Sequence, residues 1–390
     1  MSHFNVKTPR FYPLKNLEIC KRYDLGSEGT ISTDTGDYNM QTDFAKSFAD
    51  FNPWKPKTVN TNILQTPVKK VCMIYASGQH TSVTYQPSTL NSIGLNYFCI
   101  MGHNFDNAKA KFRLLAVNKD VEEDADYEEY ELECTPLFNC CIEPDTDGKN
   151  WIKGVRYQEE DPDDIILSNG SLMVEIDPDI IPRGYGRYIK IEIVPMEDTF
   201  DENLEIGSYG WGRYFDMPHT PDLNYTIGFE YDNVQTQRTI GGSDIINIKY
   251  TQKPSFCGKY EGFGREESKV ANINRRTWNL KFSSLKSEYE NNYNDVNGAL
   301  FPKTHYSNTE WRYGNNFLSR VLEVTMGGQL PFIFEEDNQV LSDENDVTFW
   351  GTGEHNEAHF YIAKFRDNNF EFDHTSHKMF NANMNIIESF

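Results

Sequence analysis

The feature of this sequence that most constrains its fold is the alternation of apolar and polar residues in many short segments. In residues 186–195, GRYIKIEIVP, an isoleucine stands at every second position from Ile189 to Ile193, and Lys190 and Glu192 stand between them. Successive side chains of a β-strand point to opposite faces, so this pattern is that of a strand and not of a helix. It predicts an antiparallel strand with one face in the core and the other face in water.

Similar segments recur along the chain and are separated by Gly, Pro, Asn and Asp, the residues that favour turns. Phe and Tyr are frequent, at 26 and 22 residues, and aromatic residues favour strands over helices. The sequence therefore predicts an all-β protein. The predicted strands are residues 69–77, 97–105, 110–118, 171–178, 186–195, 225–234, 243–251, 274–285, 330–337, 359–365 and 380–390.

Two segments of the second half carry more detail. In residues 274–285, NRRTWNLKFSSL, the side chains of Trp278, Leu280 and Phe282 share one face of the predicted strand, and we expect this face to fill a hydrophobic core. Residues 315–328, NNFLSRVLEVTMGG, have the spacing of apolar residues that is typical of a helix and end in a glycine pair. They predict the one short helix of the protein.

A chain of 390 residues is longer than one hydrophobic core usually serves, so two domains are expected. Residues 1–60 place Pro beside aromatic residues and predict an extended N-terminal arm that lies along another domain or a neighbouring subunit. Residues 61–203 predict a jelly-roll β-sandwich, and residues 225–390 predict a small C-terminal β-barrel. Residues 204–224, rich in Gly, aromatic residues and Pro, are expected to bridge the two.

The formal charge of −22, from 59 acidic and 37 basic residues, bears on partners rather than on the fold. An acidic surface repels nucleic acid and anionic lipid, so we expect no nucleic-acid partner. No apolar run approaches the roughly 20 residues that span a bilayer, and the first residues lack the apolar core of a secretory signal. We therefore expect synthesis in the cytoplasm and no membrane span, with the seven cysteines as free thiols.

Motifs that would indicate catalysis or metal binding fail on spacing. His355 and His359 are four residues apart, but no glutamate directly follows the first histidine, as a zinc-protease helix requires. The acidic segments 121–132 and 159–165 lack EF-hand spacing, so they are solvated loops or, as the alternative, weak calcium sites. The cysteines of residues 134–141 lack zinc-site spacing and a nearby histidine. The sequence has no nucleophile, phosphate-loop or dinucleotide motif. We therefore expect that the protein is not an enzyme and that it binds no cofactor and no metal.

Aromatic and basic residues at loops and strand starts are candidates for contacts with a partner. The aromatic residues of segment 207–215, GSYGWGRYF, could stack on a sugar, anchor a subunit interface or pack between the two domains. Arg275 and Arg276 begin a predicted strand, either as a solvated pair or as contacts to acidic groups of a neighbouring subunit. The candidate interface residues are Arg10, Phe11, Tyr12, Trp211, Tyr214, Phe215, Arg275 and Arg276.

Five blocks of the sequence resemble structural proteins encoded among the tail genes of tailed bacteriophages. These blocks are TPRFY at 8–12, GWGRYFDMPHTPDLNYTIGFEYDNV at 210–234, NRRTWNLKFSSL at 274–285, MGGQLPFIFEED at 326–337 and NANMNIIESF at 381–390. The resemblance implies a C-terminal β-barrel similar to that of distal tail and baseplate hub subunits, with a last strand that ends on an acidic residue. Glu388 stands at that position. Residues 92–116 and 186–195 resemble strands of a discoidin-type or carbohydrate-binding jelly roll.

This resemblance implies a non-enzymatic subunit of a phage virion, in the tail tip, a baseplate ring or an adaptor, that docks by its C-terminal barrel. Its partners would be copies of itself in a symmetric ring and neighbouring tail proteins. Two alternatives stay open: a receptor- or glycan-binding module of the tail that holds a host-surface sugar, and a capsid decoration protein. A hydrolase of surface polysaccharide is the last alternative.

Overall fold

The computed structural model describes residues 8–23, 29–34, 51, 56–61, 67–76, 95–118, 127–146, 148–157, 165–167, 170–177, 188–230, 234–248, 275–286, 300–301, 316–338 and 360–389. The chain divides into two compact units. Unit 1 combines Met1–Pro13, Phe215–Glu344 and Glu357–Phe390, and unit 2 combines Leu14–Tyr214 and Asn345–Asn356.

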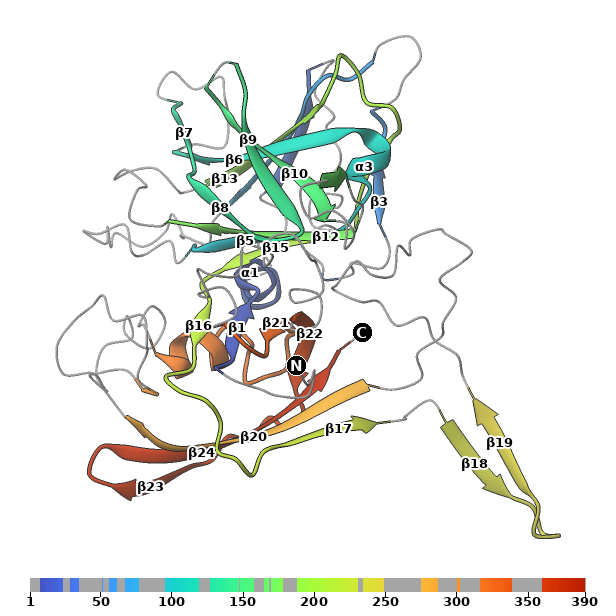
Figure 1. The fold of residues 1–390 in the computed structure, drawn as a ribbon, viewed down its shortest axis with the longest axis vertical. Coiled ribbons are helices and arrows are strands. Elements are labelled where there is room, and N and C mark those ends of the chain that lie inside the picture. The colour runs from blue at the N-terminus through green and yellow to red at the C-terminus, as the bar shows by residue number, and fades with distance from the viewer. Residues whose placement is uncertain are drawn as a thin grey trace. The chain divides into compact units, whose positions relative to one another are not determined.

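The all-β prediction is confirmed. Antiparallel strands dominate the described residues, and helices are few and short (Figure 1). Each of the eleven predicted strand segments overlaps an observed strand. Period-two alternation is a local property of the sequence, which explains why it located these strands correctly.

Unit 2 contains two larger antiparallel sheets. The first has the order β11 (Ile165–Leu167), β10 (Asn150–Tyr157), β6 (Ala110–Val117), β13 (Tyr188–Pro195), β4 (Val71–Ala76) and β2 (Gly29–Thr33), with β7 (Glu129–Glu131) on β6 and β9 (Cys140–Pro144) on β10. The second has the order β15 (Ser208–Gly212), β5 (Tyr97–His103), β12 (Gly170–Ile176) and β8 (Cys134–Phe138). The smaller elements are β3 (Lys57–Val59) paired with β14 (Leu204–Ile206), α1 (Lys15–Tyr23) and α3 (Phe105–Ala108).

The two larger sheets of unit 2 share one hydrophobic core, which makes this unit a β-sandwich. Leu114 of β6 and Ile191 of β13 belong to the same buried cluster as Phe98 of β5 and Leu172 of β12. The prediction that Lys190 faces water was wrong, because this side chain on the other face of β13 is only 1% exposed.

Unit 1 is built on one sheet with the order β16 (Phe215–Asp216), β1 (Arg10–Pro13), β21 (Phe332–Glu335), β22 (Phe360–Phe365), β24 (Met379–Glu388), β20 (Arg275–Lys286) and β17 (Thr226–Glu230). In addition, β23 (Phe372–Ser376) pairs with β24, and β18 (Val234–Arg238) pairs with β19 (Asp244–Ile248) as a separate ribbon. The predicted barrel is therefore corrected: in the described residues this sheet is open, with β16 at one end and β17 at the other.

The first strand shows that the N-terminal segment is not uniformly extended. Strand β1 lies between β16 and β21 within the sheet of unit 1, and the helix α1 that follows it belongs to unit 2 (Figure 1). Phe11 of β1 is completely buried. This part of the predicted arm is thus an inner strand of a sheet. Its removal would take away the strand that joins β16 to β21.

Two other expectations for unit 1 can be compared directly with the structure. Trp278, Leu280 and Phe282 of β20 are all buried, which confirms the predicted core face. The predicted helix at 315–328 is shorter than expected, because only a π-helical turn, Leu318–Leu322, forms before a run of turns. Positive φ angles at residues 326–328 end the helical conformation there.

The segment predicted to bridge two domains, residues 204–224, is also more regular than expected. It supplies β14 and β15 to unit 2 and β16 to unit 1. The change of unit falls between Tyr214 and Phe215.

Candidate functional site

Most of the candidate interface residues come together in the sheet of unit 1. Arg10, Phe11 and Tyr12 lie on β1, Phe215 lies on the adjacent β16, and Arg276 lies on β20. Carboxylates at the ends of β16, β21 and β24 surround the two arginines. We refer to Arg10, Tyr12, Asp216, Arg276, Trp278, Glu335, Glu336, Asn338, Tyr361 and Glu388 as the unit 1 polar network.

The first part of the unit 1 polar network ties β1 to both of its neighbours. Arg10 forms an ion pair with Asp216, whose Oδ1 also accepts a hydrogen bond of 2.7 Å from the side-chain amide of Asn338. Tyr12 donates its hydroxyl to Oε2 of Glu335 at 2.7 Å. Burial raises the pKa of Tyr12 well above its usual value, and the charge of Glu335 raises it further. Tyr12 therefore acts as a permanent hydrogen-bond donor.

The second part of the unit 1 polar network is centred on Glu336, whose side chain is completely buried. Its Oε1 accepts hydrogen bonds from Nε1 of Trp278 at 2.5 Å and from Arg276 at 3.2 Å. The Arg276 guanidinium also lies over the ring of Tyr361, 4.9 Å from its centroid. A buried carboxyl group without hydrogen-bond partners would cost several kcal/mol, so these donors offset the cost of burying the Glu336 side chain.

The end of the last strand joins the unit 1 polar network. The backbone N–H of Arg276 donates to Oε2 of Glu388 at 3.0 Å, and Glu388 is itself buried. Strand β24 ends at Glu388. Arg275, the other arginine at the start of β20, stands opposite Glu230 of β17 in the strand register.

Phe11 and Phe215 belong to the hydrophobic core of unit 1, which also contains Trp278. The ring centroid of Phe11 lies 5.4 Å from that of Phe334, 5.5 Å from that of Phe332 and 5.9 Å from that of Phe365. Phe215 packs edge-on against Phe317. These side chains hold the sheet of unit 1 together and offer almost no surface to a partner.

The remaining two candidates, Trp211 and Tyr214, lie in unit 2. Trp211 is 4% exposed and stacks on Tyr209, with centroids 5.3 Å apart and planes 2° apart. Tyr214 donates its hydroxyl to Glu175 at 2.6 Å. The Tyr209 and Trp211 rings are occupied by core packing, so they do not form an open platform for a sugar.

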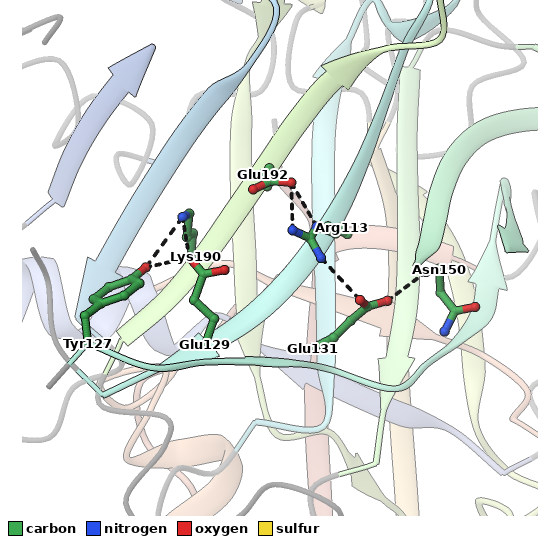
Figure 2. Close-up of polar contacts among 7 residues, drawn as sticks. All are labelled: Arg113, Tyr127, Glu129, Glu131, Asn150, Lys190 and Glu192. Atoms are coloured by element: carbon green, nitrogen blue, oxygen red, sulfur yellow. Dashed lines mark hydrogen bonds and ion pairs between the residues drawn. The ribbon is translucent and has the colours of Figure 1, made fainter. Parts of the chain in front are cut away.

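A second charged network, which the sequence did not suggest, covers one face of β6 and β13 in unit 2 (Figure 2). Arg113 of β6 contacts Glu192 of β13 at 2.9 Å and Glu131 of β7 at 3.3 Å. Glu131 also accepts a hydrogen bond from the backbone N–H of Asn150 at 2.7 Å. We refer to these four residues, together with Lys190, Glu129 and Tyr127, as the unit 2 polar network.

The buried cation of the unit 2 polar network is Lys190. Its ammonium group lies 2.5 Å from Glu129, which also accepts the Tyr127 hydroxyl at 2.8 Å. Partial burial would raise the pKa of Glu129, but the hydrogen bonds from Lys190 and Tyr127 outweigh it and lower the pKa below its usual value. The only trace of this site in the sequence is a Lys and a Glu on the polar face of a strand. The partners of Lys190 lie in an acidic run, and the partner of Glu192 is Arg113 on another strand.

This network bears on the alternative that the acidic runs bind calcium. The carboxylates of Glu129 and Glu131, at the end of segment 121–132, are engaged by Lys190 and Arg113. Residues 159–164 of the other acidic run, and His355 and His359, lie outside the described residues. Within the described parts of the chain, no group of three or more His, Cys, Asp or Glu side chains could hold a metal ion.

The cysteines of unit 2 are free thiols, as expected, for the five that can be described. Burial raises the pKa of Cys140 to about 12 and that of Cys141 to about 11. Both thiols are protonated at neutral pH and are poor nucleophiles and poor metal ligands. The five free cysteines are Cys72, Cys99, Cys134, Cys140 and Cys141.

A small cavity of about 190 Å³ lies in unit 1 beside the β-bulge of β20. Most of its lining residues are apolar, and the three polar ones are His219, Ser284 and Lys286. Ser284 has a φ of +62°, an uncommon backbone conformation for a serine. The Nδ1 of His219 lies 2.7 Å from its neighbouring carbonyl, that of Thr220, so Nδ1 is the donor and Nε2 the acceptor in the neutral ring. Among the described residues no carboxylate lines this cavity to orient the imidazole for catalysis.

No protein-family model, no curated protein and no solved structure matches this chain. In the part of the chain that the structure describes, no helix is long and apolar enough to cross a membrane.

Proposed function

We propose that this protein is a non-enzymatic structural subunit of a tailed-phage virion, in the tail tip, a baseplate ring or an adaptor. The observation that carries the proposal is the meeting of the five phage-like sequence blocks in a single sheet. Residues 8–12 and 381–390 come from opposite ends of the chain, yet both contribute strands to the sheet of unit 1. The blocks supply β1, β16, β17, β20, β21 and most of β24.

This convergence supports the proposal because it gives the resemblance a physical basis. Six of the eight strands of the unit 1 sheet carry these blocks, so the residues on which the resemblance rests are those that build one packed body. Glu388, the acidic residue at the end of the last strand, is buried and holds the backbone of Arg276. A family of assembly modules would keep such residues to preserve the sheet.

The arrangement of charged groups supports a structural role as well. In both polar networks the carboxylates face arginine, lysine, tyrosine or tryptophan donors from neighbouring strands. Such pairs fix strands to one another and do not leave an acid and a base poised across an open cleft. The chain remains strongly acidic at −22, which keeps a subunit soluble before it assembles.

The glycan-binding alternative receives no comparable support. Tyr209 and Trp211 stack on one another inside unit 2 and are nearly inaccessible to a sugar. A capsid decoration protein would share the architecture and would differ only in its position in the particle.

Labelling of purified tailed particles with an antibody raised against this chain tests the proposal. We expect gold label at the tail tip or baseplate, and peptides of the chain in the mass spectrum of the purified particles. Label over the capsid would favour the decoration alternative. Chain that is found in the host lysate and is absent from purified particles would refute a virion role.

A further inference from the structure

The chain leaves the sheet of unit 1 at one strand and returns to the strand beside it. Strand β1 ends at Pro13, and the long segment of unit 2, Leu14–Tyr214, begins at the next residue. This segment ends directly before β16, which begins at Phe215. Strands β1 and β16 are antiparallel neighbours, with Phe11 opposite Phe215. The long segment of unit 2 is therefore an insertion between two paired strands of unit 1.

Within unit 2, the start of this insertion is bonded to a strand near its end. Helix α1 lies beside β15 (Figure 1). The side-chain amide of Asn16 in α1 donates to the backbone carbonyl of Tyr209 at 3.0 Å and accepts from the backbone N–H of Trp211 at 3.2 Å. These two backbone groups are two residues apart and point to the same edge of β15, so one side chain makes the contacts that a neighbouring strand would make. Asn16 is only 3% exposed, so the two bonds are shielded from water.

Packing brings the same two parts of the insertion close together. Leu14 is buried, and a Cβ atom at position 210 would overlap with its side chain. Gly210 therefore allows the start of the insertion to approach β15 closely. At the other end, the backbone N–H of Tyr214 donates to the side-chain oxygen of Asn96 at 2.9 Å. We refer to the contacts of Leu14 and Asn16 with β15 as the end contact.

We propose that the end contact couples the two units, so that β1 stays in the sheet of unit 1 only while the ends of the insertion are held together in unit 2. With the ends held, β1 and β16 meet as the two strands of a hairpin do. If unit 2 unfolds, a flexible chain of roughly 200 residues separates them, and the probability of their meeting falls roughly 350-fold relative to a turn of about four residues.

The coupling acts on one end of the unit 1 sheet. In the described residues β16 pairs only with β1, so loss of β1 would remove both strands and leave β21 as the last strand at that end. Such a loss would also separate Arg10 from Asp216 and Tyr12 from Glu335. A chain whose unit 2 is open thus has an incomplete unit 1. This coupling does not depend on the proposed virion function, because it follows from the connections and contacts within the chain.

Hydrogen exchange with mass spectrometry on full-length variants tests the role of Asn16. Asn16→Ala removes both bonds to β15. The matched control is Asn104→Ala, because the Asn104 amide also makes two bonds to backbone groups of unit 2, to the carbonyl of Asn203 at 2.8 Å and to the N–H of Glu205 at 2.7 Å. We expect Asn16→Ala to accelerate exchange in β1 and β16 at least about tenfold and Asn104→Ala to leave it within about twofold of the wild type. Equal acceleration by the two variants, or an effect of Asn16→Ala that stays within α1 and β15, would overturn the proposal.

Insertion of a flexible linker tests the coupling without the loss of any side chain. A linker of about twelve Gly and Ser residues between Pro13 and Leu14 leaves the end contact intact but lengthens the connection from unit 2 to β1. We expect exchange in β1 and β16 to become about eightfold faster, and exchange in α1 and β15 to stay as in the wild type. The same linker between Gly241 and Gly242, in the exposed turn that joins β18 to β19, should leave β1 unchanged. Wild-type exchange of β1 in the chain with the linker after Pro13 would show that β1 is held by its own contacts alone and would overturn the coupling.

Discussion

Replacement of Phe11 by alanine tests whether the first strand is an integral part of unit 1. Phe11 is completely buried, and its ring lies within 6 Å of the rings of Phe317, Phe332, Phe334 and Phe365. A buried phenylalanine removes about 150–250 Å² from water, which at about 25 cal/mol per Å² corresponds to roughly 4–6 kcal/mol. Alanine retains a part of this, so we expect a loss of about 3–5 kcal/mol in the free energy of unfolding.

Denaturant unfolding measures the size of this loss, and hydrogen exchange with mass spectrometry shows where it acts. We expect faster exchange in β21 and β22 of unit 1, which share the sheet with β1, and a smaller change in β5 and β12 of unit 2. Phe229→Ala is the matched control: it is the same substitution at a half-exposed position of the same sheet, and it should cost less than about 1 kcal/mol. Equal losses for the two variants would refute the assignment of β1 as a core strand. Deletion of residues 1–50, by the same reasoning, should unfold unit 1 and not merely remove an arm.

The remaining predictions concern single buried groups. Trp278→Ala should cost about 3–5 kcal/mol in chemical denaturation, because it empties a core position and removes a donor to Glu336; a loss below 1 kcal/mol would contradict the packing. Burial lowers the pKa of His103 from 6.5 to about 3, so the contribution of the neutral imidazole to the free energy of unfolding is full above pH 6.5 and is lost as the pH falls toward 3. We expect up to about 5 kcal/mol of destabilisation by acid, and His103→Leu should abolish it. A variant whose stability depends on pH as the wild type does would disprove this role of His103. Lys190→Met should lower the free energy of unfolding by about 1.5–3 kcal/mol at pH 7, because it leaves Glu129 without its cation. The double variant Lys190→Met, Glu129→Gln should recover a part of this stability in thermal melts. A double variant that is no more stable than Lys190→Met would argue against an ion pair between Lys190 and Glu129.

The strands could be predicted from the sequence because their signal is local. The alternation of Trp278, Leu280 and Phe282 required only the period of a strand, and the structure buries all three. The course of β1 could not be predicted, because its four residues are too few to show a period. The hydrogen bond from Tyr12 to Glu335 joins residues 323 positions apart, and no local pattern reports such a pairing.

The candidate site could be predicted in part for a similar reason. Arginines and aromatic residues in a loop-rich sequence drew attention to Arg10 and Arg276, and both proved to be central to the unit 1 polar network. Their partners could not be identified, because Asp216 and Glu336 reach them only through the order of strands in the folded sheet. Lys190 was expected in water, since a lysine on the polar face of a strand is normally solvated; the side chains of Tyr127 and Glu129, which lie beside it, supply its partners inside the protein.

The polar contacts of β1 also explain how so short a strand finds one register. Arg10 and Tyr12 point to the face opposite Phe11, and a shift of one residue would exchange the two faces. Such a shift would remove Phe11 from the aromatic core and separate Arg10 from Asp216 and Tyr12 from Glu335. Buried polar pairs add little net stability compared with apolar packing, but the cost of breaking them is large. The sheet of unit 1 therefore accepts β1 in a single register, which is set by partners more than 200 residues later in the chain.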